Sequence, residues 1–139
     1  MDHTSHDAPR TVLIVEDNDK NLKLARDLLQ YGGFRTFEAE LAAEGVDLAR
    51  SVHPDVVIMD IQLPDFDGWE ALRRLRSDPE TADLVVLAVT AYGGTAGQNR
   101  FVDGGFDGYL AKPIDAGTFS DTVAGFCRRR GVSTGLPEP

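Results

Sequence analysis

Polar side chains follow four apolar runs that have the character of buried strands. Glu16 and Asp17 come directly after "TVLIV", and Asp60 ends the run "DVVIMD". Thr90 closes the run "LVVLAVT", and Lys112 follows "GYLA". If these runs are parallel strands of one sheet, their carboxyl ends border the crevice in which such sheets bind ligands. We therefore expect these five side chains to converge at one edge of the sheet.

The residue types of this group favour phosphoryl chemistry. Neighbouring carboxylates repel one another and would take up protons unless a cation joined them. Mg²⁺ prefers a few carboxylates, water and phosphate oxygens. Aspartate oxygens form aspartyl phosphates, and a metal ion and a lysine can neutralise charge on the transferring group. The sequence therefore predicts that Asp60 is a phosphoacceptor with Mg²⁺ as cofactor, while Thr90 hydrogen-bonds a phosphoryl oxygen.

Strand-like and helical patterns alternate along the chain. The apolar runs lie at 11–15, 34–39, 55–60, 84–90 and 108–111, and helical periodicity appears at 19–31, 41–52, around 69–75, at 95–104 and at 115–130. Glycines at and before the start of the fourth helical pattern make it weak. The alternation predicts an α/β fold, with a doubly wound five-stranded parallel sheet and five helices on its two faces. The polar run at 34–39 is expected near an edge of the sheet.

Single residues predict where elements begin and end. Asn18 or Asp19 can cap the first helix, and Gly32–Gly33 can end it. Asp65 and Asp67 lie in the loop after the third strand, and we expect them only to shape that turn.

Length and composition limit the class of protein. The 139 residues suit one domain, which we place at 11–130 between a disordered arm at 1–10 and a disordered tail at 131–139. The net charge of −9 argues against nucleic-acid and anionic-membrane partners. A single cysteine, the lack of a secretory signal and the lack of a long apolar run suggest a cytoplasmic protein.

Four motifs occur together and in order: "VLIVEDN", "VVIMDIQLPDFDG", "AVTA" and "GYLAKPI". Over about residues 11–130 they resemble the receiver domain of bacterial two-component response regulators. The resemblance implies a flavodoxin-like sheet in the order 2-1-3-4-5. No output module is recognised after the last helical pattern, so we expect a stand-alone receiver. The wording "VEDNDKNLKL" and "MDIQLPDFDG" is similar to receivers of hybrid kinases and cell-cycle regulators, which favours a phosphorelay or regulatory-adaptor role.

The resemblance also implies roles for the acidic residues. Asp60 would accept a phosphoryl group from a phosphohistidine on a sensor histidine kinase or a histidine phosphotransfer protein. Mg²⁺ would be bound by Asp17, Asp60 and the backbone carbonyl of Gln62. Glu16 would also contribute, partly through water. The protein would then be a signalling switch rather than an enzyme, although it assists its own phosphoryl transfer and dephosphorylation.

Further roles are implied for residues around the phosphoacceptor. Lys112 would contact the phosphoryl group, aimed by a cis bond before Pro113. Thr90 and Tyr109 resemble the switch pair of the family. Without the other motifs, Thr90 would be read as an ordinary threonine at a strand end, and Tyr109 as a tyrosine that only packs. Gln62 and Tyr92 would tune the rate of dephosphorylation. Because the bulky ring of Tyr92 has no carboxamide or carboxylate to orient a water molecule, we expect a long-lived phosphorylated form. The resemblance also implies a downstream protein target. It further implies that two copies of the chain could pair through a face formed by the fourth helix, the fifth strand and the fifth helix.

Two other classes share parts of this pattern. A phosphatase of the haloacid dehalogenase type also places a nucleophilic aspartate after an apolar strand, but it has a second aspartate where this chain has Gln62. A flavodoxin-like flavin binder would have a phosphate-binding loop after the first strand, where this chain has the acidic "EDNDKN". Both are kept as alternatives.

Overall fold

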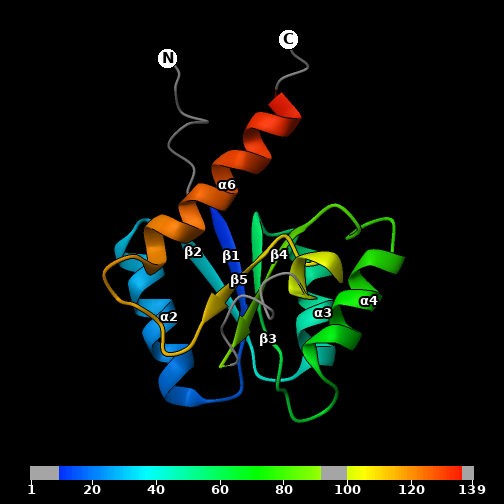
Figure 1. The fold of residues 1–139 in the computed structure, drawn as a ribbon, viewed down its shortest axis with the longest axis horizontal. Helices are drawn as coiled ribbons and strands as arrows, with labels where there is room; N and C mark the ends of the chain where they lie inside the picture. Colours follow the sequence, from blue (N-terminus) through cyan, green and yellow to red (C-terminus); the bar gives the residue numbers. More distant parts are fainter. Residues whose placement is uncertain (1–9, 92–99, 136–139) are drawn as a thin grey trace.

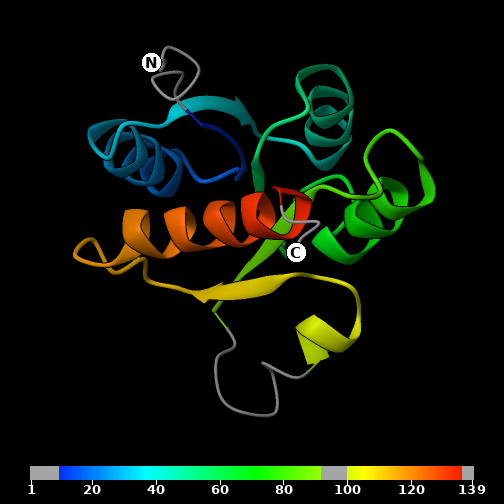
Figure 2. The same cartoon turned by 90° about the horizontal axis from the view of Figure 1, so that it is seen from above.

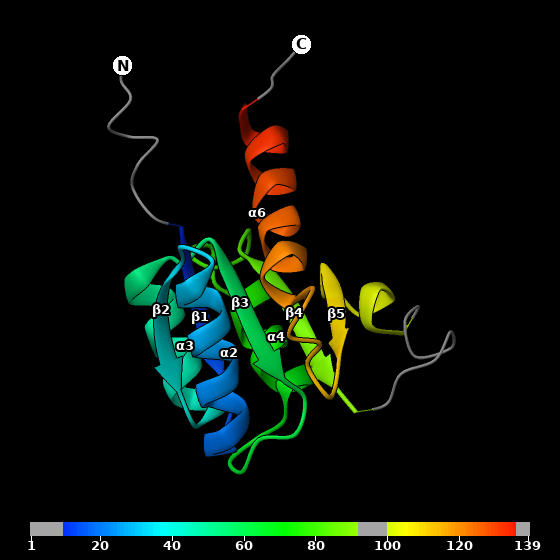
Figure 3. The same ribbon diagram turned by 90° about the vertical axis from the view of Figure 1, so that its left-hand side faces the viewer.

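Five parallel strands form the centre of the fold in the computed structural model, which describes residues 10–91 and 100–135 and the side chains as far as Cys127. The sheet order is β2-β1-β3-β4-β5, and every neighbouring pair is parallel. Figure 3 shows the five arrows side by side. The predicted sheet and its order are confirmed. The strands are β1 (Thr11–Val15), β2 (Arg35–Ala39), β3 (Val56–Asp60), β4 (Val85–Thr90) and β5 (Gly108–Ala111).

The strand side chains alternate between two cores, one on each face of the sheet. In β3, Val57 and Met59 belong to one core, whereas Val56 and Ile58 belong to the other. All residues of β3 and β4 are buried, which explains why their sequences are continuously apolar. The more polar β2 lies at an edge of the sheet, as expected.

Helices cover both faces of the sheet (Figures 1 and 2). Helices α2 and α6 contribute to one core, and α3 and α4, together with Phe101 and Phe106, contribute to the other. Within the described part of the chain, no helix combines the length and apolar character that crossing a bilayer requires. The helix bounds are α2 (Asp19–Tyr31), α3 (Ala42–Val52), α4 (Gly68–Ser77) and α6 (Phe119–Gly135).

The limits of α2 follow from the capping residues that the sequence offers. The side chain of Asn18 accepts a hydrogen bond from the backbone N–H of Asn21 at 3.0 Å, so Asn18 rather than Asp19 is the cap. At the other end, the N–H of Gly32 donates to the carbonyl of Leu28 at 3.1 Å. Both ends of α2 therefore lie where the sequence predicted them.

The last helix differs from its predicted range of 115–130. Asp115 accepts a hydrogen bond from the N–H of Gly117 at 2.9 Å, which makes a turn and delays the helix to Phe119. The helix then runs to Gly135, so residues 131–135 are helical rather than part of a tail. Of the predicted helix at 95–104, residues 100–103 are helical, and the earlier part lies outside the described residues.

Candidate functional site

Three acidic side chains meet at the carboxyl edge of the sheet. Strands β1 and β3 are neighbours, and Val15 pairs with Met59, so the residues that follow each strand come together. Carboxylate oxygens of Glu16, Asp17 and Asp60 lie within 4.8 Å of one another, and we call these residues the acidic cluster. Glu16 and Asp60 are buried, whereas Asp17 is exposed. One cation could therefore bind all three residues from the solvent side.

Lys112 lies directly against the acidic cluster. Its Nζ atom is 2.7 Å from Oδ2 of Asp60 and 3.5 Å from Oε1 of Glu16. The backbone N–H of Lys112 donates to the carbonyl of Thr90 at 2.8 Å, which extends the pairing of β4 and β5 to the sheet edge. The Lys112–Pro113 peptide bond is cis. Desolvation opposes the charge of Lys112, but the two carboxylates outweigh it and raise the pKa of the ammonium.

Backbone N–H groups hold the two buried carboxylates. The N–H of Gln62 donates to Oδ1 of Asp60 at 3.0 Å, and the N–H of Asn18 donates to Oε2 of Glu16 at 3.1 Å. The Gln62 N–H and Lys112 stabilise negative charge on Asp60 at the end of a buried strand, whereas the Asn18 N–H acts on Glu16.

The acidic cluster carries more negative charge than its surroundings balance. The pKa of Glu16 is raised to about 7, chiefly by burial and also by the nearby charge of Asp60, while the Asn18 N–H and Lys112 act in the opposite direction. A divalent cation would remove this imbalance. Three converging carboxylates are also ligands of the hard oxygen type that Mg²⁺ prefers. The residues present therefore fit a magnesium ion.

A glycine lets helix α4 begin directly against the backbone of the phosphoacceptor candidate. A Cβ atom at Gly68 would lie 2.6 Å from the carbonyl oxygen of Asp60 and 2.9 Å from the Cα of Ile61. The N–H of Gly68 donates to the Ile61 carbonyl at 2.8 Å. Asp67 caps α4 by accepting from the N–H of Glu70 at 2.9 Å. The loop from Ile61 to Asp67 is thus closed at its base beside the acidic cluster.

The predicted switch residues lie on β4 and β5. Thr90 is buried at the end of β4 and pairs with Ala111. Tyr109 is half-buried, and its ring stacks on Phe101 with 6.1 Å between the centroids and 17° between the planes. Tyr109 thus packs in an aromatic group, while Thr90 lies at the same sheet edge as Lys112. Tyr92 lies outside the described residues.

Two hollows border the predicted site residues. One, of about 640 Å³, is lined by Asp17, Leu41 and Pro64, among others. We call it the Asp17 groove. The other, of about 480 Å³, includes Gln62 and Thr90 in its lining. The acidic cluster is therefore reachable from the surface on the side of Asp17.

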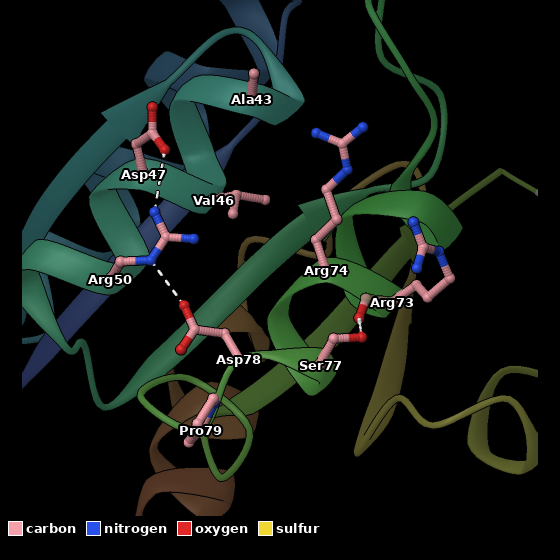
Figure 4. A pocket seen from close by; sticks show the side chains of 9 residues that line it. All are labelled: Ala43, Val46, Asp47, Arg50, Arg73, Arg74, Ser77, Asp78 and Pro79. Atoms are coloured by element: carbon pink, nitrogen blue, oxygen red, sulfur yellow. Dashed lines mark hydrogen bonds and ion pairs between the residues drawn. The ribbon is translucent and has the colours of Figure 1, made fainter.

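A third hollow, of about 500 Å³, lies between α3 and α4 (Figure 4). Its lining contains no member of the acidic cluster. Figure 4 shows Arg50 between Asp78, at 2.7 Å, and Asp47, at 3.4 Å. Two acids thus balance the positive charge of Arg50, and the residues that line this hollow favour no particular ligand.

Asp65 has a contact that sequence reasoning missed. Its carboxylate accepts hydrogen bonds from the N–H groups of Ala42 at 2.8 Å and Ala43 at 2.9 Å, at the start of α3. The one signal in the sequence is that Leu41, the residue before α3, has a side chain that cannot cap a helix. Because the partner lies more than 20 residues away, the local pattern does not reveal it.

The class of protein that this fold and site define is supported by comparison with known proteins. Residues 12–124 match the model of the response regulator receiver domain, and the chain belongs to this family. It is thus a receiver domain of the two-component response regulators. The family assignment favours the receiver over the phosphatase and flavin-binding alternatives.

Three individual proteins are similar to this chain over most of its length. The chain is 40% identical over 117 residues to the polar-differentiation response regulator DivK of Brucella ovis, a match that covers 84% of this chain and 95% of DivK. A second similar protein is the receiver domain of a sensor histidine kinase from Pseudomonas aeruginosa, which was solved with a magnesium ion coordinated in its active-site cleft. The two structures superpose with a TM-score of 0.78 at 26% identity, and the match covers 87% of this chain and 99% of the Pseudomonas chain. A chemotaxis response regulator of Vibrio cholerae shares the fold, with a TM-score of 0.80 at 23% identity, covering 86% of this chain and 99% of its own.

Proposed function

We propose that this receiver domain is a phosphorylation-dependent switch in which Asp60 accepts the phosphoryl group. The donor would be a phosphohistidine on a sensor histidine kinase or a histidine phosphotransfer protein. The observation that carries the proposal is the setting of Asp60: a buried carboxylate 2.7 Å from Lys112 that shares one small space with Glu16 and Asp17. A carboxylate that only caps a turn needs neither a lysine nor two further acids around it.

Mg²⁺ is the cofactor that we propose for this site. Asp17, Asp60 and the backbone carbonyl of Gln62 would hold it, with Glu16 partly through water. When bound, it would neutralise negative charge on the phosphoryl oxygens. The converging oxygens and the raised pKa of Glu16 support this proposal, as does the magnesium-bound receiver structure from Pseudomonas aeruginosa.

The proposed transfer forms one bond and breaks one. A carboxylate oxygen of Asp60 attacks phosphorus, and the P–N bond to the donor histidine breaks. The bonding electron pair stays on the imidazole nitrogen, which then takes up a proton. Lys112 is placed to stabilise the transferred charge because its ammonium already contacts Asp60. The chain's own contribution is therefore positioning and electrostatic stabilisation.

Modification of Asp60 would be transmitted through Thr90 and Tyr109. In this proposal the Thr90 hydroxyl moves toward the phosphoryl group, and the Tyr109 ring leaves its stack on Phe101 and turns inward. The surface around β5 would then change for a downstream protein partner or a second copy of the chain. Gln62 and Tyr92 would govern how fast water removes the phosphoryl group.

The test uses a small phosphodonor. Incubation with Mg²⁺ and acetyl phosphate is expected to add one phosphoryl group to the intact protein, as measured by mass spectrometry. Asp60→Asn should abolish the gain, whereas Asp83→Asn, at an exposed acid outside the acidic cluster, should keep it. The proposal is wrong if the wild-type protein gains no mass or if Asp60→Asn gains as much. Steady turnover of many phosphomonoesters would favour the phosphatase, and a bound yellow flavin would favour the flavin binder.

A further inference from the structure

The carboxylate of Asp65 connects two elements that are distant in the sequence. It accepts from the N–H groups of Ala42 and Ala43, which lie 23 and 22 residues before it. These are the first two N–H groups of α3, and such groups have no acceptor within their own helix. Leu41, at the N-cap position, makes no side-chain capping bond. Asp65 therefore caps α3 from another loop, and we call this contact the Asp65 clamp.

The Asp65 clamp is a charge-assisted contact. Partial desolvation works against the charge of Asp65, but the backbone donors of Ala43 and Ala42 outweigh it and lower the pKa of the carboxyl below its ordinary value. Asp65 also faces the positive end of the α3 dipole. An ionised carboxylate that accepts two N–H groups holds its partners more strongly than a neutral acceptor would.

One end of the clamp is the loop that follows the phosphoacceptor. At its base, the N–H of Ile61 donates to the carbonyl of Val89 at 3.1 Å, and Gly68 closes the loop onto Ile61. Between these points, the N–H of Gln62 contacts Asp60, and Asp65 reaches α3 three residues later. A shift of the loop at Asp65 would therefore be transmitted over a short stretch of backbone to Gln62.

The Asp65 clamp also lies beside the Asp17 groove. Leu41 and Pro64 both line this groove together with Asp17. Leu41 immediately precedes the two N–H groups that the clamp holds, and Pro64 immediately precedes Asp65. The clamp thus joins the two walls of the groove next to the acidic cluster.

We propose that Asp65 is a positioning residue for the phosphoacceptor site, because its clamp on α3 fixes Gln62 against Asp60 and sets the width of the Asp17 groove. The proposal deepens the proposed function, on which it rests. Among the described residues, the Asp65 side chain hydrogen-bonds to the start of α3 and not to Asp60 or the proposed metal ligands. Its effect passes through the backbone of the loop.

The test separates positioning from simple helix capping. Asp65→Ala removes the clamp, and Leu41→Ser in the same chain supplies α3 with a local cap that does not hold the loop. Three quantities are measured: the free energy of unfolding in urea, amide hydrogen exchange at the Gln62 N–H without metal, and the Kd for Mg²⁺ titrated alone. Leu41→Ser by itself is the control.

Asp65→Ala is expected to accelerate exchange at Gln62 and to raise the Kd for Mg²⁺ roughly three- to tenfold, less than the about 10- to 100-fold typical of a group bonded to a metal ligand. In the double variant, stability should return while fast exchange and the raised Kd persist. Recovery of all three quantities, or unchanged exchange and Kd in Asp65→Ala, would overturn the proposal. If Asp65→Ala does not fold, Asp65→Asn replaces it, with smaller changes expected in the same directions. None of these measurements uses phosphoryl transfer, so failure of Asp60 to be phosphorylated is a separate result.

Discussion

Glu16 is the acid whose surroundings most oppose its charge. It is buried, lies against Asp60 and has a pKa raised to about 7 from an ordinary value of 4.5. The metal-free folded protein therefore holds a proton on Glu16 at a pH at which the unfolded chain has lost it. This proton links the stability of the protein to pH.

The free energy of unfolding of the metal-free protein is expected to fall as pH rises between these two pKa values. Because the folded pKa lies above the unfolded one, the contribution of Glu16 is complete below about pH 4.5 and lost as pH passes about 7. At about 1.4 kcal/mol for each pKa unit, this contribution does not exceed about 4 kcal/mol.

Glu16→Gln should remove this part of the pH dependence, whereas Glu40→Gln, at an exposed acid, should keep it. Urea unfolding with a chelator present, at about pH 5 and about pH 8, measures the difference between the variants. Equal pH dependence in wild type and Glu16→Gln would show that burial of Glu16 does not raise its pKa as argued.

The four charged residues of the site could be found from the sequence because each follows an apolar run. Strand ends of a parallel sheet share one edge, so the sequence alone groups Asp17, Asp60 and Lys112, and the structure brings them together. The clamp made by Asp65 could not be found, because it depends on how the loop after β3 lies against α3. Contacts that two separate loops make in space leave no periodic signal in either one.

At the scale of elements, Arg76 joins the end of α4 to two loops. Its guanidinium donates to the carbonyls of Ala82 at 2.9 Å and Leu84 at 2.6 Å, before β4, and to the carbonyl of Gly105 at 3.0 Å, before β5. It also pairs with Asp107 at 3.0 Å. One planar side chain therefore satisfies acceptors from two separate segments, a geometry that suits arginine.

Arg76→Ala is expected to lower the free energy of unfolding by about 2–3 kcal/mol, since it removes several hydrogen bonds from a charged donor. Arg76→Lys should recover only part of this loss because an ammonium lacks the planar fork. Arg73→Ala, at an exposed arginine paired with Glu70 on the same helix, should lose clearly less stability than Arg76→Ala, because solvent screens an exposed ion pair. Urea denaturation measures all three variants. Equal losses for Arg76→Ala and Arg73→Ala would contradict the role assigned to Arg76.

At the scale of the whole molecule, the alternation of strands and helices was enough to predict the sheet and its two covered faces. The limits of α6 were not predictable in the same way. Its start depends on a turn in which Asp115 holds Gly117, and its end at Gly135 lies beyond glycine and β-branched residues that favour an earlier stop. Local propensity is thus a weak guide to the exact residues at which a helix begins and ends.

The acidic cluster joins the ends of β1 and β3, so an ion bound there stabilises the native arrangement and not the unfolded chain. In the unfolded chain Asp17 and Asp60 are 43 residues apart in sequence (60 − 17) and do not form a common site. A ligand that binds only the folded state raises its stability, by about 2.7 kcal/mol at a concentration 100 times Kd. Mg²⁺ is therefore expected to raise the thermal unfolding midpoint, and a chelator should reverse the rise. Asp17→Asn should reduce it strongly, whereas Asp19→Asn, the same change of charge two residues away and outside the acidic cluster, should not. Thermal unfolding at increasing Mg²⁺ concentration measures the effect, and an equal rise in both variants would show that the ion binds elsewhere.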